Sequence, residues 1–314
     1  MIPRTLSWSS RHMLLVVFAG LVLGLAVIVP SFRETANLVN IVEQQSIIGI
    51  VACGMLLMIL LGGFDLSVGA VGAASSVVGA WVMAALGIVV GVAIALIVGV
   101  IIGLCNGVII ARYGVNPFVA TLGMQSVVVG LLFVATDAIP VYGVPAEFLS
   151  FGLGRIGPVP VAALVFGGAA LFVGMLLKYT VLGHHIYAVG GSREASRLAG
   201  IPVVRTTVMV YVIGAALAAL AGLVLLGQTS IGQPGAAATW PLSAIAAVAI
   251  AGVPLTGGRG SVGPVVLGTV LLGTIANGLN LFGVSPYWQP AITGAVILVA
   301  VALDVRHRRS GDST

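Results

Sequence analysis

Long apolar runs alternate with short polar segments along the whole chain. Most runs are close to 20 residues long, which lets a helix cross about 30 Å of hydrocarbon at about 1.5 Å per residue. We therefore predict an all-α polytopic membrane protein with about ten transmembrane helices. The predicted spans are residues 13–31, 41–61, 66–86, 88–111, 117–136, 158–178, 206–227, 242–257, 262–282 and 288–304.

Basic residues divide unequally between the two sets of loops. With the N-terminus in the cytoplasm, eleven of the thirteen Lys and Arg residues fall inside: Arg4, Arg11, Arg112, Lys178, Arg193, Arg197, Arg205, Arg259, Arg306, Arg308 and Arg309. Only Arg33 and Arg155 fall outside. Cytoplasmic loops carry such an excess, so we predict that both termini are cytoplasmic.

The composition agrees with a membrane protein. Of the 314 residues, 60% are hydrophobic and 7% are charged, whereas soluble domains carry about 25% charged residues. The net charge of +5 is spread between apolar runs, so we expect lipid and no nucleic acid as a partner. No loop is long enough for another domain, and residues 1–314 are predicted to form a single transmembrane domain.

Small residues recur at four-residue spacing, which lets membrane helices approach closely. We interpret four such pairs as helix-packing surfaces: Gly20/Gly24, Gly87/Gly91, Gly99/Gly103 and Gly103/Gly107.

The polar cytoplasmic loop 179–205 carries a predicted short helix. Ser192 can cap it, Glu194 suits its first turn, and Gly200 can end it in the left-handed conformation. Ala195, Leu198 and Ala199 share one face, and Arg193 and Arg197 share the other. A helix this short needs a partner surface, either lipid headgroups or protein; the alternative is a solvated loop.

Two glycine-rich segments have separate interpretations. GGRGSVG (257–263) matches a dinucleotide fingerprint only formally, because it links two apolar spans, and we predict an interhelical turn. In GGFDLSVG (62–69), Asp65 lies near the membrane boundary. It either borders a transport path at a helix break or caps the following helix, and both roles are compatible.

No catalytic or metal site is predicted. A Walker A loop needs Gly-Lys followed by Ser or Thr, but the chain's single lysine, Lys178, is followed by Tyr179. The protein therefore cannot bind ATP in that way.

Five ordered segments resemble the permease subunits of bacterial sugar ABC importers of the ribose, xylose and galactoside type, which are related to branched-chain amino-acid permeases. The segments are GGFDLSVGAVGA, NPFVATLGM, LGHHIYAVGGSREASRLAGI, AIAAVAIAGVPLTGGRGSVG and NGLNLFGVSPYWQ. The resemblance runs from about Leu38 to Asp304 and implies a permease of the inner membrane.

The resemblance also implies partners. A second permease subunit would complete the pore, two cytoplasmic ATPase subunits would bind ATP and Mg, and a periplasmic or lipoprotein solute-binding protein would deliver a small polar solute. The segment GGSREASRLAGI resembles the family's coupling helix. The ATPase-coupling residues would be Ser192, Arg193, Glu194, Ala195, Arg197, Leu198 and Gly200.

The chain departs from the family at one place. The family commonly carries Glu-Leu-Asp where this sequence reads Pro241-Leu242-Ser243. Some autoinducer-type importers pair two non-identical permeases, one of which lacks these acids. The departure therefore leaves open a homodimer or a paralogous heterodimer, and an altered substrate class.

Three functions remain in competition. The first is a sugar importer permease, the second a related permease for nucleosides, branched-chain amino acids or an autoinducer-like sugar derivative. The third is a secondary transporter or a channel. The predicted spans are almost free of the mid-membrane ionisable residues typical of ion coupling, which disfavours a proton-coupled transporter but not a passive channel. Candidate path residues, for which packing is the alternative role, are Asp65, Phe118, Thr121, Asn277 and Asn280.

Overall fold

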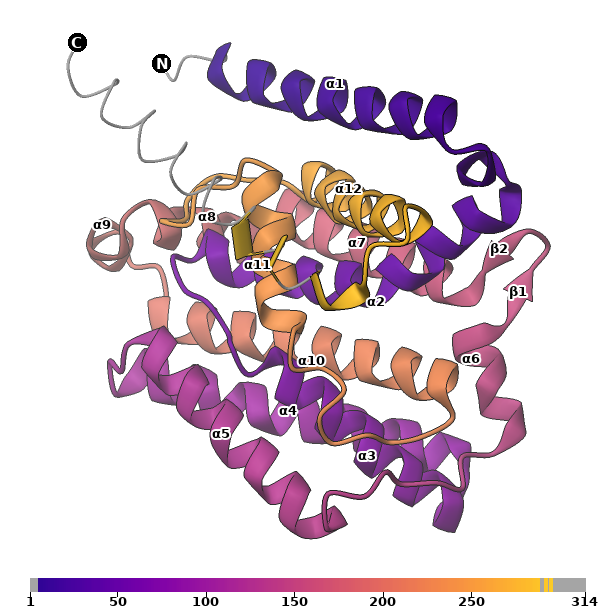
Figure 1. The fold of residues 1–314 in the computed structure, drawn as a ribbon. Coiled ribbons are helices and arrows are strands. Elements are labelled where there is room, and N and C mark those ends of the chain that lie inside the picture. The colour runs from indigo at the N-terminus through magenta and orange to yellow at the C-terminus, as the bar shows by residue number, and fades with distance from the viewer. Residues whose placement is uncertain (1–4, 289–290, 293, 296–314) are drawn as a thin grey trace.

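The computed structural model describes residues 5–288, 291–292 and 294–295, which form helices and one short hairpin (Figure 1). The helices are α1 (Thr5–Ile28), α2 (Thr35–Leu60), α3 (Val68–Leu86), α4 (Ile88–Arg112), α5 (Pro117–Thr136), α6 (Leu149–Leu153), α7 (Val161–Tyr179), α8 (Val181–Gly191), α9 (Arg193–Leu198), α10 (Val203–Thr229), α11 (Trp240–Ile250) and α12 (Val262–Leu281). The hairpin pairs β1 (Arg155–Ile156) with β2 (Val159–Pro160), and short 3-10 turns cover Pro30–Arg33, Ala146–Phe148 and Pro286–Trp288.

Seven of the described helices are long and apolar enough to cross a membrane, namely α2, α3, α4, α5, α7, α10 and α12. Two shorter apolar helices, Leu14–Ile28 and Trp240–Ile250, accompany them. These helices confirm the all-α polytopic membrane fold. The predicted span 288–304 lies mostly outside the described residues, so the count of ten and the sides of the termini stay predictions.

Close helix packing builds the core. The second half of α2, Ile50–Leu60, is fully buried, and α4 lies against α10 through the predicted glycine surface. A β-carbon on Gly103 would lie 2.6 Å from both the Ala215 β-carbon and the Tyr211 carbonyl oxygen. Only a residue without a side chain permits this approach.

The other predicted packing pairs differ in their surroundings. Gly91 faces the Met83 backbone of α3, so it also marks a close approach. A β-carbon on Gly20 or Gly24 would meet nothing within 4 Å among the described residues. The spacing of small residues therefore predicts the α4 surface well and the α1 surface not at all.

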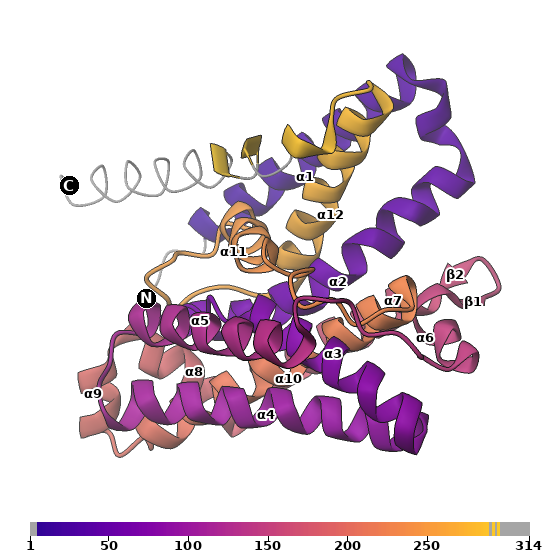
Figure 2. The same cartoon turned by 60° about the horizontal axis from the view of Figure 1, so that its bottom comes forward.

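The two ends of the bundle carry different elements. Figures 1 and 2 show α6 and the hairpin at one end and α9 at the other. At the hairpin end, the Arg155 guanidinium lies 3.5 Å from the Glu43 carboxylate of α2. The hairpin and α9 thus lie at opposite ends of the bundle, which agrees with the predicted outer side for the hairpin and the predicted cytoplasmic side for α9.

The predicted cytoplasmic loop 179–205 contains two helices rather than one. Besides α9, it forms α8, which begins where the Thr180 side chain accepts a hydrogen bond from the Gly183 amide at 3.1 Å. Gly183, Ile186 and Val189 of α8 are buried. Helix α8 was not predicted, because the adjacent His184 and His185 interrupt the apolar pattern of its first turns.

Candidate functional site

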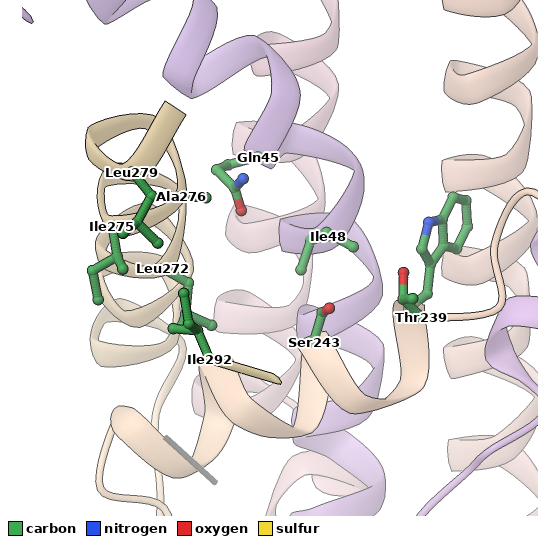
Figure 3. A pocket seen from close by; sticks show the side chains of 10 residues that line it. Gln45, Ile48, Thr239, Ser243, Leu272, Ile275, Ala276, Leu279 and Ile292 are labelled. Atoms are coloured by element: carbon green, nitrogen blue, oxygen red, sulfur yellow. The ribbon is translucent and has the colours of Figure 1, made fainter. Parts of the chain in front are cut away.

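A pocket of about 190 Å³ lies between α2, α11 and α12 (Figure 3). Ligand sites are mostly apolar with a few placed polar groups, and this pocket has that composition. Its lining residues are Gln45, Ile48, Thr239, Trp240, Ser243, Leu272, Ile275, Ala276, Leu279 and Ile292. Drug-sized ligands occupy about 300–1,000 Å³, so the pocket suits a smaller solute.

Close backbone packing positions the polar groups of the pocket. Gln45 lies against α12 at Gly273, where any β-carbon would overlap the Gln45 side chain. Trp240 begins α11, is 5% exposed, and its ring fills the space beside Gly72 of α3. Figure 3 shows Gln45 and Ser243 on neighbouring helices around the pocket.

Ser243 belongs to the segment Pro241-Leu242-Ser243, for which the resemblance implied a departure from the family, and its side chain lines the pocket. No charged side chain is among the described residues that line it. The pocket therefore offers the hydroxyls of Thr239 and Ser243 and the amide of Gln45 without a fixed charge. Such groups can hydrogen-bond to a neutral polar solute.

A second polar cluster lies at the start of α3, in the interior. Asp65 is fully buried and accepts a hydrogen bond from the Ser67 amide at 2.7 Å. Its other oxygen lies 3.5 Å from the Asn106 amide nitrogen, which also donates to the Ser67 hydroxyl at 2.8 Å. No partner for the Asn106 amide oxygen occurs among the described residues.

Burial raises the pKa of Asp65, although its hydrogen bonds to Ser67 and Asn106 lower it in part. No basic side chain pairs with Asp65 in the described part of the chain. Desolvation without an opposite charge disfavours the ionised carboxylate.

The segment around Asp65 is held by three helices. The Leu66 amide donates to the Thr121 hydroxyl at 3.0 Å, and the Tyr211 hydroxyl donates to the Phe64 carbonyl at 3.0 Å. Gly62 turns the chain with a φ of +83°. Asp65 accepts from the amide of Ser67, the cap residue of α3, but no side-chain cap hydrogen bond forms at this helix start. Both roles expected for Asp65, capping and transport, therefore stay predictions.

The other predicted path residues lie on two helices, Phe118 on α5 and the pair Asn277 and Asn280 on α12. Asn277 exchanges two hydrogen bonds with Asn37 of α2, Asn280 is exposed, and Phe118 is 52% exposed on α5. None of the five predicted residues is among the described residues that line the pocket. Of the positions singled out in the sequence, only Ser243, noted as a departure from the family pattern, is among the described residues that line the pocket.

The predicted coupling residues form α9 as a preformed helix. The Ser192 hydroxyl accepts from the Ala195 amide at 3.2 Å, and Arg197 donates to Glu194 at 2.8 Å. The carboxylate raises the pKa of the Arg197 guanidinium. Gly200 has a φ of +79°, as expected for a helix end.

The surface of α9 is open. Arg193, Glu194, Ala195, Arg197 and Leu198 are all exposed, and Leu198 is 79% exposed. Ser196 is buried, so this side chain of α9 packs against the rest of the bundle. An exposed apolar side chain such as Leu198, surrounded by charged residues, is typical of a surface that binds another protein.

Comparisons with known proteins identify relatives over nearly the full chain. The Ribose import permease protein RbsC of Bacillus subtilis is 39% identical over 90% of this chain and 89% of the relative. The protein of the same name from Escherichia coli is 38% identical over 96% and 95%. The L-arabinose transport system permease protein AraH of E. coli is 36% identical over 97% and 93%. No solved structure gives a significant match.

A family model described as "Branched-chain amino acid transport system / permease component" matches residues 37–301. This match confirms the resemblance inferred from the five sequence segments. Together with the seven apolar helices, it makes the protein a multi-pass protein of the bacterial inner membrane. The chain belongs to the branched-chain amino acid transport system permease component family.

Proposed function

We propose that this chain forms the translocation pathway of an ATP-driven importer for a small, neutral sugar. The observation that carries the sugar assignment is the uncharged pocket between α2, α11 and α12, in a chain whose relatives are ribose and arabinose permeases. Sugars present many hydroxyls and one apolar face, which match the hydroxyl and amide groups and the apolar side chains that line the pocket.

ATP hydrolysis takes place in a partner in this proposal. Two permease subunits form the pore, cytoplasmic ATPase subunits bind ATP and Mg, and a solute-binding protein delivers the sugar. The exposed helix α9 receives the ATPase through Ser192, Arg193, Glu194, Ala195, Arg197, Leu198 and Gly200. Closure of the ATPase then shifts the helices between outward-open and inward-open states, because ATP has different affinities for the two.

The test is uptake in proteoliposomes that contain the permease, the ATPase and the binding protein encoded with it. We expect uptake of radiolabelled D-ribose or L-arabinose that needs ATP and stops when the ATPase is omitted. Uptake that continues without the ATPase would instead establish a channel or a secondary transporter.

A second candidate is import of an autoinducer-like sugar derivative by a heterodimer, favoured by Pro241 and Ser243 in place of the family's acids. Thermal-shift measurements of the binding protein against sugars, nucleosides and branched-chain amino acids separate the substrate classes. Copurification with a second, non-identical permease would establish the heterodimer.

A further inference from the structure

The glycine-rich turn between α11 and α12 lies against the helix that precedes α9. The Tyr187 hydroxyl of α8 donates to the Gly260 carbonyl at 2.7 Å, and the Gly258 amide donates to the Leu60 carbonyl at the end of α2 at 2.8 Å. Figure 1 shows this turn and α8 at the end of the bundle that carries α9. Four elements, α2, α8, α11 and α12, therefore meet here.

Gly190 allows the backbones to touch at this point. A β-carbon on Gly190 would overlap the Leu60 carbonyl oxygen and lie 2.8 Å from the Gly258 nitrogen. The neighbouring Gly191 has nothing within 4 Å of such a carbon. The turn itself needs glycine, because Gly258 has a φ of +77°.

The same contact point lies at the ends of all three pocket helices. At about 1.5 Å per residue, about 18 Å of α2 separates Leu60 from Ile48, and about 10 Å of α11 separates Ile250 from Ser243. Along α12, about 15 Å separates Val262 from Leu272. Helices of this length transmit displacement as rigid elements.

A direct connection links this point to the coupling helix. Helix α8 ends at Gly191, Ser192 is the cap residue, and α9 begins at Arg193. The Ser192 amide donates to the Ala188 carbonyl at 3.1 Å, which ties the cap to the last turn of α8. A displacement of α9 is therefore passed to α8 without an intervening loop.

We propose that Tyr187, Gly190, Leu60, Gly258 and Gly260 form a transmission joint, which carries displacement of α9 to the walls of the pocket. The joint gives a role to the GGRGSVG turn, which has no place in solute contact or ATP binding. This inference rests on the proposed function, because it requires the ATPase to act on α9. Tyr187 and Gly190 are positioning residues in this scheme.

Two variants perturb the joint and two matched variants do not. Gly190→Ala forces α8 away from Leu60, and Tyr187→Phe removes only the hydrogen bond to Gly260. Gly191→Ala makes the same chemical change where there is free space. Tyr179→Phe removes a hydroxyl from a tyrosine that is 71% exposed.

The experiment compares hydrogen–deuterium exchange in the whole transporter, with and without ATP and vanadate, in nanodiscs. In the wild type we expect trapping to change exchange both in α9 and in the connection 251–261. Gly190→Ala and Tyr187→Phe should keep the change in α9 and lose at least half of the change in the connection. ATP-driven D-ribose uptake, measured in proteoliposomes, should fall about fivefold or more in both variants, a coupling effect of the usual size.

The controls Gly191→Ala and Tyr179→Phe should behave as the wild type. The proposed joint would be overturned if, in both Gly190→Ala and Tyr187→Phe, trapping changed the exchange of α9 and of residues 251–261 as much as in the wild type. A wild type whose α9 does not respond to trapping would overturn the proposed function itself. Melting temperatures of all variants separate loss of transmission from loss of folding, since Tyr187→Phe should melt within a few degrees of the wild type.

Discussion

Asn37 and Asn277 hold each other through a reciprocal pair of hydrogen bonds between their side-chain amides. Asn37 donates to the Asn277 oxygen at 3.1 Å, and Asn277 donates to the Asn37 oxygen at 2.7 Å. The pair joins α2 to α12 across 240 residues of sequence, close to the pocket formed by these helices. The pair therefore links two of the helices that line the pocket.

Removing one partner of this pair should destabilise the fold. Asn277→Ala removes both hydrogen bonds of the pair and leaves the Asn37 amide with only its bond to the Phe32 carbonyl at 3.2 Å, at a cost of about 1 kcal/mol. We expect Asn37→Ala to cost a similar amount and the double variant to cost less than the sum. Melting of the three variants in nanodiscs measures this coupling, and strictly additive effects would show that the pair contributes no interaction of its own.

The glycine surface of α4 predicts a contrast between two identical substitutions. Gly103→Ala places a methyl group 2.6 Å from the Ala215 β-carbon and should cost about 1–3 kcal/mol through overpacking. Gly123→Ala, which meets nothing within 4 Å, should be neutral or slightly stabilising because alanine favours helices. Melting temperatures of the two variants test this, and equal values would refute the close approach.

Sequence patterns predicted the seven long apolar helices, because burial in lipid imposes length and hydrophobicity directly. The predicted span 242–257 is wrong in its bounds, since α11 ends at Ile250 and a turn follows. Helix α9 was also predictable, since its cap, its ion pair and its terminal glycine act within a few residues of one another. The partners of Asn277 and Gly190 were not predictable. They lie on other helices, and only the packing of α2 against α12 and α8 brings them together.

Polarity was an incomplete guide to the pocket. It singled out Asp65 and Thr121, whose groups hold the segment between α2 and α3. The pocket instead has Gln45 and Thr239 beside many apolar residues, and apolar residues of a membrane helix give no signal that separates pocket from lipid. Ser243 was visible only as a departure from a family pattern.

The buried carboxyl of Asp65 predicts a pH-dependent stability. Its pKa in the folded protein is raised by burial, above about 3.9 in an unfolded chain. The folded state then binds the proton more tightly, so the contribution of Asp65 to stability is fully present below about pH 4 and is lost as the pH rises through the folded pKa. Asp65→Asn carries no ionisable carboxyl and should not lose stability in this way as the pH rises.

Melting temperatures between pH 4 and 8 check this expectation. The stability of Asp65→Asn relative to the wild type should increase with pH. Asparagine can still accept from the Ser67 amide, and a turned Asn106 amide can accept from it. Parallel pH profiles for wild type and Asp65→Asn would contradict an elevated pKa.

The ion pair of α9 predicts loss of coupling without loss of folding. Glu194 and Arg197 are exposed, and exposed pairs add little to stability. We expect Glu194→Ala and Arg197→Ala to lower ATP-driven uptake about tenfold, within the usual range of coupling effects. ATPase activity stimulated by the binding protein and melting temperatures complete the measurement. Arg33→Ala, at the opposite end of the bundle, is the matched control and should retain uptake.

Filling the pocket should block transport while leaving ATP hydrolysis intact. Ala276 lines the pocket on α12, and a tryptophan there would occupy most of a cavity of about 190 Å³. Ala276→Trp should therefore abolish D-ribose uptake in proteoliposomes, whereas basal ATPase activity depends on the distant α9 and should persist. Ala85→Trp adds the same ring at an exposed position of α3 and should transport normally. Uptake by Ala276→Trp at the wild-type rate would place the sugar path outside this pocket, because a solute cannot pass through space that an indole already fills.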